Sequence, residues 1–297
     1  MFDIINSQLV KKQLECDNFL IEDTNSSNNI CCIYFSSHGI YYPVTETVFE
    51  DKIVRNNYFE WYKHRLPSAK RHIFLRDIRL SFYVEGINKR CNSIDKLIEL
   101  LKTLTEGYDV VTVGSSAGGY MSALMGGVLN SKISFVFSGQ FDLFSDFSFK
   151  TKELLLKHQK DSVYSKWYDI SSFYKSNMVY FCPVNSSCDK IQLKKLYDQF
   201  ESNNSNLKNV IIFPLKSNKH GVIINTYCLD KFFNMPFSEI YQFRQNFHSA
   251  IISPFLLSTK LIGFYKTFLG SFKLFFSKIN NLKLKLYNIY CKKLYSL

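Results

Sequence analysis

Short runs of apolar residues recur along the chain and predict the strands of a buried sheet. Each predicted strand spans four to six mostly apolar residues between polar or glycine-containing segments, which is typical of strands covered on both faces. Apolar positions three and four residues apart predict helices between them, as in 94–104. Strands alternating with helices indicate an α/β fold with a mostly parallel sheet and helices on both faces. The predicted strands are 30–35, 71–75, 108–113, 133–137, 178–181 and 210–213.

The end of the strand 108–113 gives the clearest chemical signal in the chain. It runs into residues 114–118, whose sequence GSSAG fits the G-x-S-x-G pattern of a nucleophile elbow. In such an elbow the central serine lies on a sharp turn between a strand and a helix, and the glycines let chain segments approach closely. We therefore expect Ser116 to be a nucleophile. The patterns of the common phosphate-binding loops are absent from the sequence.

A nucleophilic serine needs a general base, and the base needs an orienting acid. Asp189 follows the strand 178–181, and His220 follows the strand 210–213. Ser116, Asp189 and His220 occur in the chain order that accompanies a nucleophile elbow. Loops at the same edge of a parallel sheet can converge, which would bring these three side chains together.

Alternatives stay open for both partners of the serine. Asp142, after an earlier strand, is the second candidate for the acid, whereas Asp198 lies within a predicted helix and is typical of a solvated charge. His248 is the second candidate for the base. Three further histidines lie in basic or helical contexts typical of surface or packing residues: His64, His72 and His158.

An acyl-transfer site also needs donors that stabilise the oxyanion of the tetrahedral intermediate. The backbone N–H of Ala117, next after the nucleophile, is the first expected donor. The second is expected from the loop after the strand 30–35, at Gly39 or Ile40. His38 in the same loop is expected to shape the loop or to act on the oxyanion side, with a purely structural role as the alternative.

Together the elbow, the Ser-Asp-His order and the His-Gly loop resemble the α/β-hydrolase superfamily over residues 28–245. The string GSSAGGY at 114–120, a short cap segment and the Ser-rich approach to Asp189 resemble a narrower group. That group is the α/β-hydrolase-type O-acetyltransferases of bacterial capsular and surface polysaccharide loci. It implies acetyl-CoA as acyl donor, a polysaccharide or oligosaccharide hydroxyl as acceptor, and acetyl carried on Ser116. It also implies His220 as general base and acid, oriented by Asp189, although no signature for coenzyme A is visible.

Two other functions remain open. A serine esterase or deacetylase would use the same three residues with water as the acceptor, and no residue in the sequence separates it from a transferase. A catalytically silent scaffold that uses the fold for partner binding is disfavoured by the intact set of Ser116, Asp189 and His220.

The segment 143–177 interrupts the alternation of strands and helices at the place where this fold commonly inserts a cap. Its aromatic residues could form a wall for an acyl chain or sugar rings, or could pack the cap onto the body. These residues are Phe144, Phe147, Phe149, Tyr164, Trp167, Tyr168, Phe173 and Tyr174.

The formal net charge of +12 is unevenly distributed over the 297 residues. Residues 251–297 contain eight lysines and no acidic residue or arginine, so the first 250 residues carry a net charge of only +4. We therefore divide the chain into a near-neutral catalytic domain, 1–250, and a basic, apolar C-terminal extension with helical character, 251–297.

The extension interleaves its lysines with aromatic and aliphatic residues. This composition favours an anionic membrane surface as partner, with apolar side chains inserted and lysines reaching the headgroups. Packing onto the body or onto a second subunit is the alternative, because the lysines do not collect on one helical face. Nucleic-acid binding is disfavoured by the absence of arginine and the high aliphatic content.

The cysteines and the N-terminus bear on the compartment. The eight cysteines show no repeated short spacing, and no signal peptide is visible after Met1. We expect reduced thiols, a cytoplasmic location at the inner face of the cell membrane, and no metal site, because no second cysteine pair completes a zinc-type pattern. No apolar run reaches the about 18 to 20 residues that a transmembrane helix needs.

Overall fold

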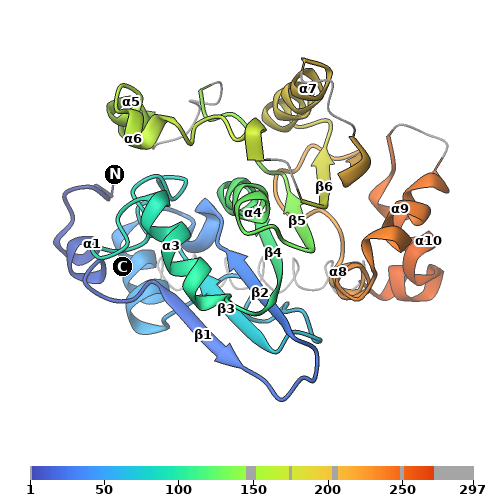
Figure 1. Cartoon of the computed structure of the whole chain (residues 1–297), viewed down its shortest axis with the longest axis horizontal. Helices are drawn as coiled ribbons and strands as arrows, with labels where there is room; N and C mark the ends of the chain where they lie inside the picture. Colours follow the sequence, from blue (N-terminus) through green and yellow to red (C-terminus); the bar gives the residue numbers. More distant parts are fainter. Residues whose placement is uncertain (1, 145–151, 174–175, 203–206, 248–250, 271–297) are drawn as a thin grey trace, which may run out of the picture.

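A seven-stranded sheet forms the centre of the computed structural model, which describes residues 2–144, 152–173, 176–202, 207–247 and 251–270. The strand order is β1-β3-β2-β4-β5-β6-β7; β1 is antiparallel to its neighbour and the other pairs are parallel. The predicted α/β-hydrolase-like architecture is confirmed (Figure 1). The strands are β1 (Phe19–Asp23), β2 (Ile30–Phe35), β3 (Arg71–Leu75), β4 (Asp109–Ser115), β5 (Ile133–Phe137), β6 (Met178–Pro183) and β7 (Val210–Leu215).

Helices cover both faces of the sheet because alternate strand residues point to opposite sides. In β2, Ile33 belongs to a core with α3 and α4, whereas Tyr34 belongs to a second core with α8, α9 and α10. Figure 1 shows α3 and α4 in front of the sheet and α8, α9 and α10 at the right of the view, beyond β6. These helices are α3 (Ile94–Leu104), α4 (Ala117–Val128), α8 (Thr226–Phe233), α9 (Phe237–Gln245) and α10 (Pro254–Ile262).

The remaining helical segments are short, apart from α7. They connect strands or lie at the edge of the sheet where the parallel strands end (Figure 1). In chain order they are α1 (Gln8–Gln13), η1 (His38–Tyr41), α2 (Glu46–Phe49), η2 (Glu50–Arg55), α5 (Lys152–His158), α6 (Ser162–Ser165), η3 (Ser171–Phe173), α7 (Ser187–Ser202) and η4 (Leu207–Asn209).

The register of the central strands brings their carboxyl ends to one edge. Phe35, the last residue of β2, lies opposite Gly114 in β4, and Phe137, the last residue of β5, lies opposite both Ser115 and Phe181. The loops after β2, β4, β5, β6 and β7 therefore start at nearly the same height. This edge is where ligands bind in open α/β sheets.

Two helices begin within segments that are glycine-rich or polar in the sequence. α4 starts at Ala117, because only one residue, Ser116, makes the turn and the glycines after it are already helical. α7 starts at Ser187, which places Asp189 in its first turn. Polar residues in a first helical turn look like a loop in the sequence, since the same residue types favour both.

The cap segment packs onto the body through its aromatic residues. Trp167 and Tyr168 are buried, and the hydroxyl of Tyr120 in α4 donates a hydrogen bond of 2.6 Å to the carbonyl of Trp167. The backbone N–H of Leu143 donates to the carbonyl of Tyr168 at 2.7 Å. Trp167 and Tyr168 therefore pack the cap onto the body, which is one of the two roles expected for the cap aromatics. Three further cap aromatics lie outside the described residues: Phe147, Phe149 and Tyr174.

The first part of the C-terminal extension also belongs to the packed body. Ile252 is fully buried and pairs beside β7, donating its N–H to the carbonyl of Pro214 and accepting from the N–H of Lys216, both at 2.8 Å. Leu257 in α10 is fully buried, and Ser258 contacts Cys228 of α8 at 3.2 Å. Residues 271–297 lie outside the described part. In the part of the chain that is described, no helix is long and apolar enough to cross a membrane.

The role of α10 in the body can be tested with two adjacent leucines. Leu257→Ala removes a fully buried side chain, whereas Leu256 is 44% exposed. We expect Leu257→Ala to lower the free energy of unfolding by about 2–5 kcal/mol, because it leaves a cavity in the core. Leu256→Ala should change it by less than about 0.5 kcal/mol. Urea denaturation followed by circular dichroism measures both; equal effects would mean that α10 does not contribute to the core.

Candidate active site

Ser116 lies at the turn between β4 and α4 in a strained backbone conformation. Its φ of 56° and ψ of −122° are rarely adopted by residues other than glycine, as expected of a nucleophile elbow. Its N–H donates to the carbonyl of Phe137, the last residue of β5, at 2.9 Å. The serine is thus held by the neighbouring strand, and its side chain emerges at the carboxyl edge of the sheet.

Two glycines let the first turn of α4 lie directly against the ends of β2 and β5. A Cβ on Gly118 would lie 2.2 Å from the carbonyl oxygen of Phe35, and a Cβ on Gly119 would lie 2.8 Å from the Cα of Gly139. Both contacts are to backbone, which cannot move aside cheaply. The elbow therefore sits close to the loop after β2, which begins at Ser36.

The structure brings the three predicted side chains into one hydrogen-bonded series. His220 Nε2 lies 2.8 Å from Ser116 Oγ, and His220 Nδ1 lies 2.9 Å from Asp189 Oδ2 and 3.1 Å from Asp189 Oδ1. Asp189 is 1% exposed, whereas the side chain of His220 is 32% exposed. A carboxylate on one imidazole nitrogen fixes the tautomer in which the other nitrogen can accept the proton of the serine hydroxyl.

The alternative acid is occupied elsewhere. Asp142 accepts a hydrogen bond from the N–H of Phe144 at 2.7 Å and forms an ion pair with Lys195 of α7. It is therefore a structural carboxylate at the base of the cap. The alternative base, His248, lies outside the described residues.

The other three histidines lie away from Ser116. His72 is buried and hydrogen-bonds Tyr34 at 3.0 Å, and His158 of α5 pairs with Glu85 at 2.7 Å. His64 is exposed. These environments agree with the surface and packing roles expected for them.

Ser138, the residue after β5, holds the loop that carries His220. Its side chain is fully buried, and its Oγ lies 3.0 Å from both the carbonyl oxygen and the N–H of Gly221. The hydroxyl donates to the first group and accepts from the second. Because Gly221 follows His220 directly, this pair of hydrogen bonds fixes the position of the imidazole relative to β5.

The three backbone N–H groups predicted to bind the oxyanion differ in the hydrogen bonds that they make in the structure. As the first residue of α4, Ala117 has an N–H with no partner inside the helix. In the loop after β2, the N–H of Gly39 donates to Ser37 Oγ at 3.0 Å and the N–H of Ile40 donates to the carbonyl of Ser37 at 3.3 Å. Both amides are used within the turn η1, so either could reach an oxyanion only if that turn opened.

Glu60 fixes the start of this loop. Its carboxylate accepts hydrogen bonds from the Ser37 hydroxyl at 2.9 Å and from the Ser37 N–H. Burial raises the pKa of Glu60, and the hydrogen bonds from Ser37 oppose that shift. Sequence analysis missed Glu60, and nothing in the pattern of residues around it marks a partner 23 positions away.

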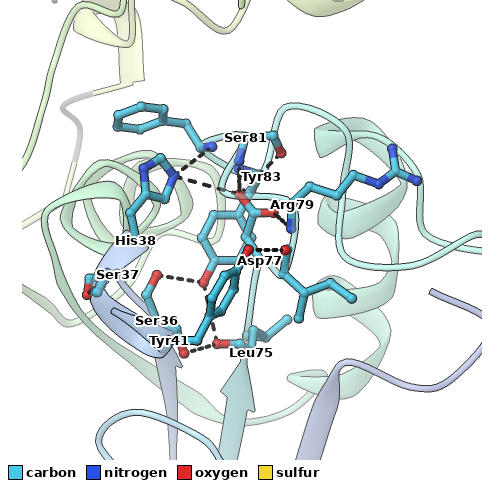
Figure 2. Close-up of polar contacts among 12 residues, drawn as sticks. Ser36, Ser37, His38, Tyr41, Leu75, Asp77, Arg79, Ser81 and Tyr83 are labelled. Carbon is cyan, nitrogen blue, oxygen red and sulfur yellow. Dashed lines mark hydrogen bonds and ion pairs between the residues drawn. The ribbon is translucent and has the colours of Figure 1, made fainter. Parts of the chain in front are cut away.

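The imidazole of His38 points toward the loop that carries Asp77 (Figure 2). Its Nε2 accepts a hydrogen bond from the N–H of Phe82 at 3.2 Å and lies 3.9 Å from Asp77 Oδ2. Burial, with a smaller contribution from His220, lowers the pKa of His38 to about 3. A histidine with so low a pKa is a poor general base, which agrees with the expectation that it shapes the loop.

Asp77 organises the loop that faces His38. Its buried carboxylate accepts hydrogen bonds from the N–H groups of Arg79 at 3.0 Å, Ser81 at 2.5 Å and Tyr83 at 2.9 Å (Figure 2). Burial raises the pKa of Asp77 to about 6, against the effect of these hydrogen bonds. Leu80, Phe82 and Tyr83 adopt positive φ angles, so the loop wraps tightly around the carboxylate.

No cluster of three or more His, Cys, Asp or Glu side chains that could hold a metal ion occurs within the described ranges. The seven cysteines among the described residues are free thiols. The groups gathered around Ser116 are the imidazole of His220, the carboxylate of Asp189 behind it and the backbone N–H of Ala117.

No protein-family model and no curated protein matches the sequence. Among solved structures, the capsule O-acetyltransferase of Neisseria meningitidis serogroup A is similar, with a TM-score of 0.47 and 14% identity over 78% of this chain and 93% of that one. S-formylglutathione hydrolase of Staphylococcus aureus has a TM-score of 0.42 at 11% identity over 64% and 77% of the two chains. Esterase B of Lactobacillus rhamnosis has a TM-score of 0.42 at 13% identity over 78% and 88%. The chemistry of the site rests on its own geometry.

The role of Ser138 in placing His220 can be tested by Ser138→Ala. The substitution removes both hydrogen bonds to Gly221, and we expect kcat for ester cleavage to fall ~10- to 100-fold with little change in KM, because the imidazole is displaced. Ser122→Ala is the matched control. Ser122 is an equally buried serine that donates to the carbonyl of Phe135 at 3.1 Å, in the middle of α4. Both variants should lose about 1–3 kcal/mol of stability; an equal loss of kcat in both would contradict the positioning role.

We predict that the imidazole of His38 does not titrate between pH 5 and pH 8. Burial disfavours the imidazolium, so the folded protein should bind no proton at His38 until the pH approaches about 3. We expect its Cε1–Hε1 NMR signal, assigned by its loss in His38→Gln, to stay constant between pH 5 and pH 8. A midpoint near the ordinary value of 6.5 would show that the ring is charged in this range and would contradict the placement beside Phe82.

Proposed function

We propose that this chain is a serine O-acyltransferase that moves acetyl from acetyl-CoA to a hydroxyl of a capsular or other surface polysaccharide. The observation that carries the acyl-transfer chemistry is the series Ser116 Oγ, His220 Nε2 at 2.8 Å and His220 Nδ1 to Asp189 at 2.9 Å. The donor and the acceptor are supported by the resemblance of residues 114–120 and the cap to polysaccharide O-acetyltransferases.

In the first half of the proposed reaction, Ser116 is acylated. Ser116 Oγ attacks the thioester carbonyl carbon while its proton passes to His220 Nε2, and the charge on the imidazolium is balanced by Asp189. The carbon–sulfur bond then breaks, and His220 returns the proton to the departing thiolate. Acetyl is left as an ester on Ser116.

In the second half, an acceptor hydroxyl takes the place of the thiol. It gives its proton to His220 Nε2 as its oxygen attacks the acyl carbon, and Ser116 Oγ recovers that proton as it leaves. The N–H of Ala117 stabilises the oxyanion in both halves. A second donor comes from Gly39 or Ile40 once η1 releases one of their amides from Ser37.

Hydrolysis is the second candidate, and one observation favours it. The side chain of His220 is 32% exposed, so water can approach the base directly. If water attacks the acyl-serine in place of a sugar hydroxyl, the same three residues make an esterase or a deacetylase. A polysaccharide bound over His220 would exclude this water.

Purified protein incubated with acetyl-CoA, with and without capsular saccharides, separates these functions. We expect coenzyme A release to rise with saccharide and the saccharide to gain 42 mass units per acetyl group, a chemical mass difference seen by mass spectrometry. Ser116→Ala should lower transfer by at least ~10⁴-fold, because it removes the nucleophile. Circular dichroism checks that the variant is folded.

The other outcomes assign the other functions. Rapid cleavage of acyl esters that no saccharide alters, with loss in Ser116→Ala, would make the protein an esterase. Activity that survives Ser116→Ala would exclude the mechanism altogether. A protein that forms no acyl-serine with any ester and is not labelled by a phosphonate would be a non-catalytic scaffold.

A further inference from the structure

An exposed aromatic face lies on the described part of the C-terminal extension. It comprises Phe255, Leu256, Phe264, Tyr265 and Phe268, whose exposed fractions are 48%, 44%, 64%, 73% and 52%. Three of the rings lie in series: Phe255 and Phe264 have centroids 6.2 Å apart, and Phe264 and Phe268 have centroids 6.4 Å apart. Single exposed apolar residues are ordinary, but a contiguous group of this kind marks an interaction surface.

The opposite side of the same segment is firmly packed. Leu257 and Ser258 in α10 are buried, and so is Thr267 in the helical turn that follows Gly263. One side of residues 254–270 therefore adds to the core of the body, and the other side presents the aromatic face. The face has a fixed orientation on the protein, because the segment that carries it is anchored.

The charged residues of the segment that carries the face are all of one sign. Lys260 and Lys266 are exposed, and residues 251–297 contain six more lysines and no acidic residue. Lys260 donates to the carbonyl of Asn246 at 3.0 Å and lies over the ring of Phe247, so its charge is held near the body. A partner that covers this face must therefore accept apolar rings and positive charge together.

We propose that this aromatic face docks on an anionic lipid bilayer surface. Aromatic rings insert at the level of the headgroups, and lysines at the rim attract anionic lipid. A second protein copy fits less well, since two such faces would bring like charges together. The inference is independent of the acyl-transfer proposal, because it uses no residue of the Ser116 site.

The test uses full-length protein and vesicles, without any catalytic readout. Sedimentation with vesicles of phosphatidylcholine and phosphatidylglycerol at a 7:3 ratio should pellet the protein, and pure phosphatidylcholine should pellet far less. Raising sodium chloride from 0.1 M to 0.5 M should weaken binding, because salt screens the lysines. Phe264→Ser/Tyr265→Ser should weaken it by more than ~10-fold, and Lys266→Gln by about five-fold.

The matched control is Val163→Ser. Val163 is 51% exposed on α6, which lies at the other end of the molecule from α10 (Figure 1). This variant should bind vesicles as the unchanged protein does. Thermal unfolding checks that every variant is folded.

Three results would overturn the proposal. Equal binding to both kinds of vesicle would remove the role of charge, and full binding by Phe264→Ser/Tyr265→Ser would place the contact elsewhere in the chain. A dimer in solution that becomes monomeric in that double variant, without vesicle binding, would make the face a subunit interface.

Discussion

The carboxyl end of β5 is the point on which the geometry of the site depends. The carbonyl of Phe137 accepts from the N–H of Ser116, and the hydroxyl of Ser138 holds both backbone groups of Gly221. One dipeptide thus fixes the nucleophile from one side and the base from the other. The distance of 2.8 Å between Ser116 Oγ and His220 Nε2 follows from these two attachments to a single strand end.

Backbone contacts around the elbow impose a second constraint, on the oxyanion side. Gly118 lets α4 approach the end of β2 until no side chain would fit, so the loop that begins there must pass beside Ser116. That loop is then held from two directions, by Glu60 on Ser37 and by the N–H of Phe82 on His38. Within the turn η1, the N–H groups of Gly39 and Ile40 donate to Ser37. Either amide can therefore donate to an oxyanion only if a bound substrate displaces Ser37.

The sequence predicts the parts of this arrangement that have a local cause. Apolar runs predict six of the strands because burial on both faces leaves its mark within each strand, whereas β1, an edge strand with half-buried residues, has no such mark. Asp189 and His220 can be inferred because each follows a strand. Ser138 cannot, since its partner lies 83 positions away and a buried serine has no distinctive pattern.

The boundary at residue 250 is drawn from the distribution of charge. The packing of the chain does not change at that residue. The lysine-only composition begins after residue 250, yet Ile252 pairs beside β7 and Leu257 completes the core over α8. A helix can serve both purposes because positions one residue apart point about 100° away from each other. The buried positions anchor the segment, so a surface that binds the exposed aromatic face would orient the whole sheet, and with it the edge that carries Ser116.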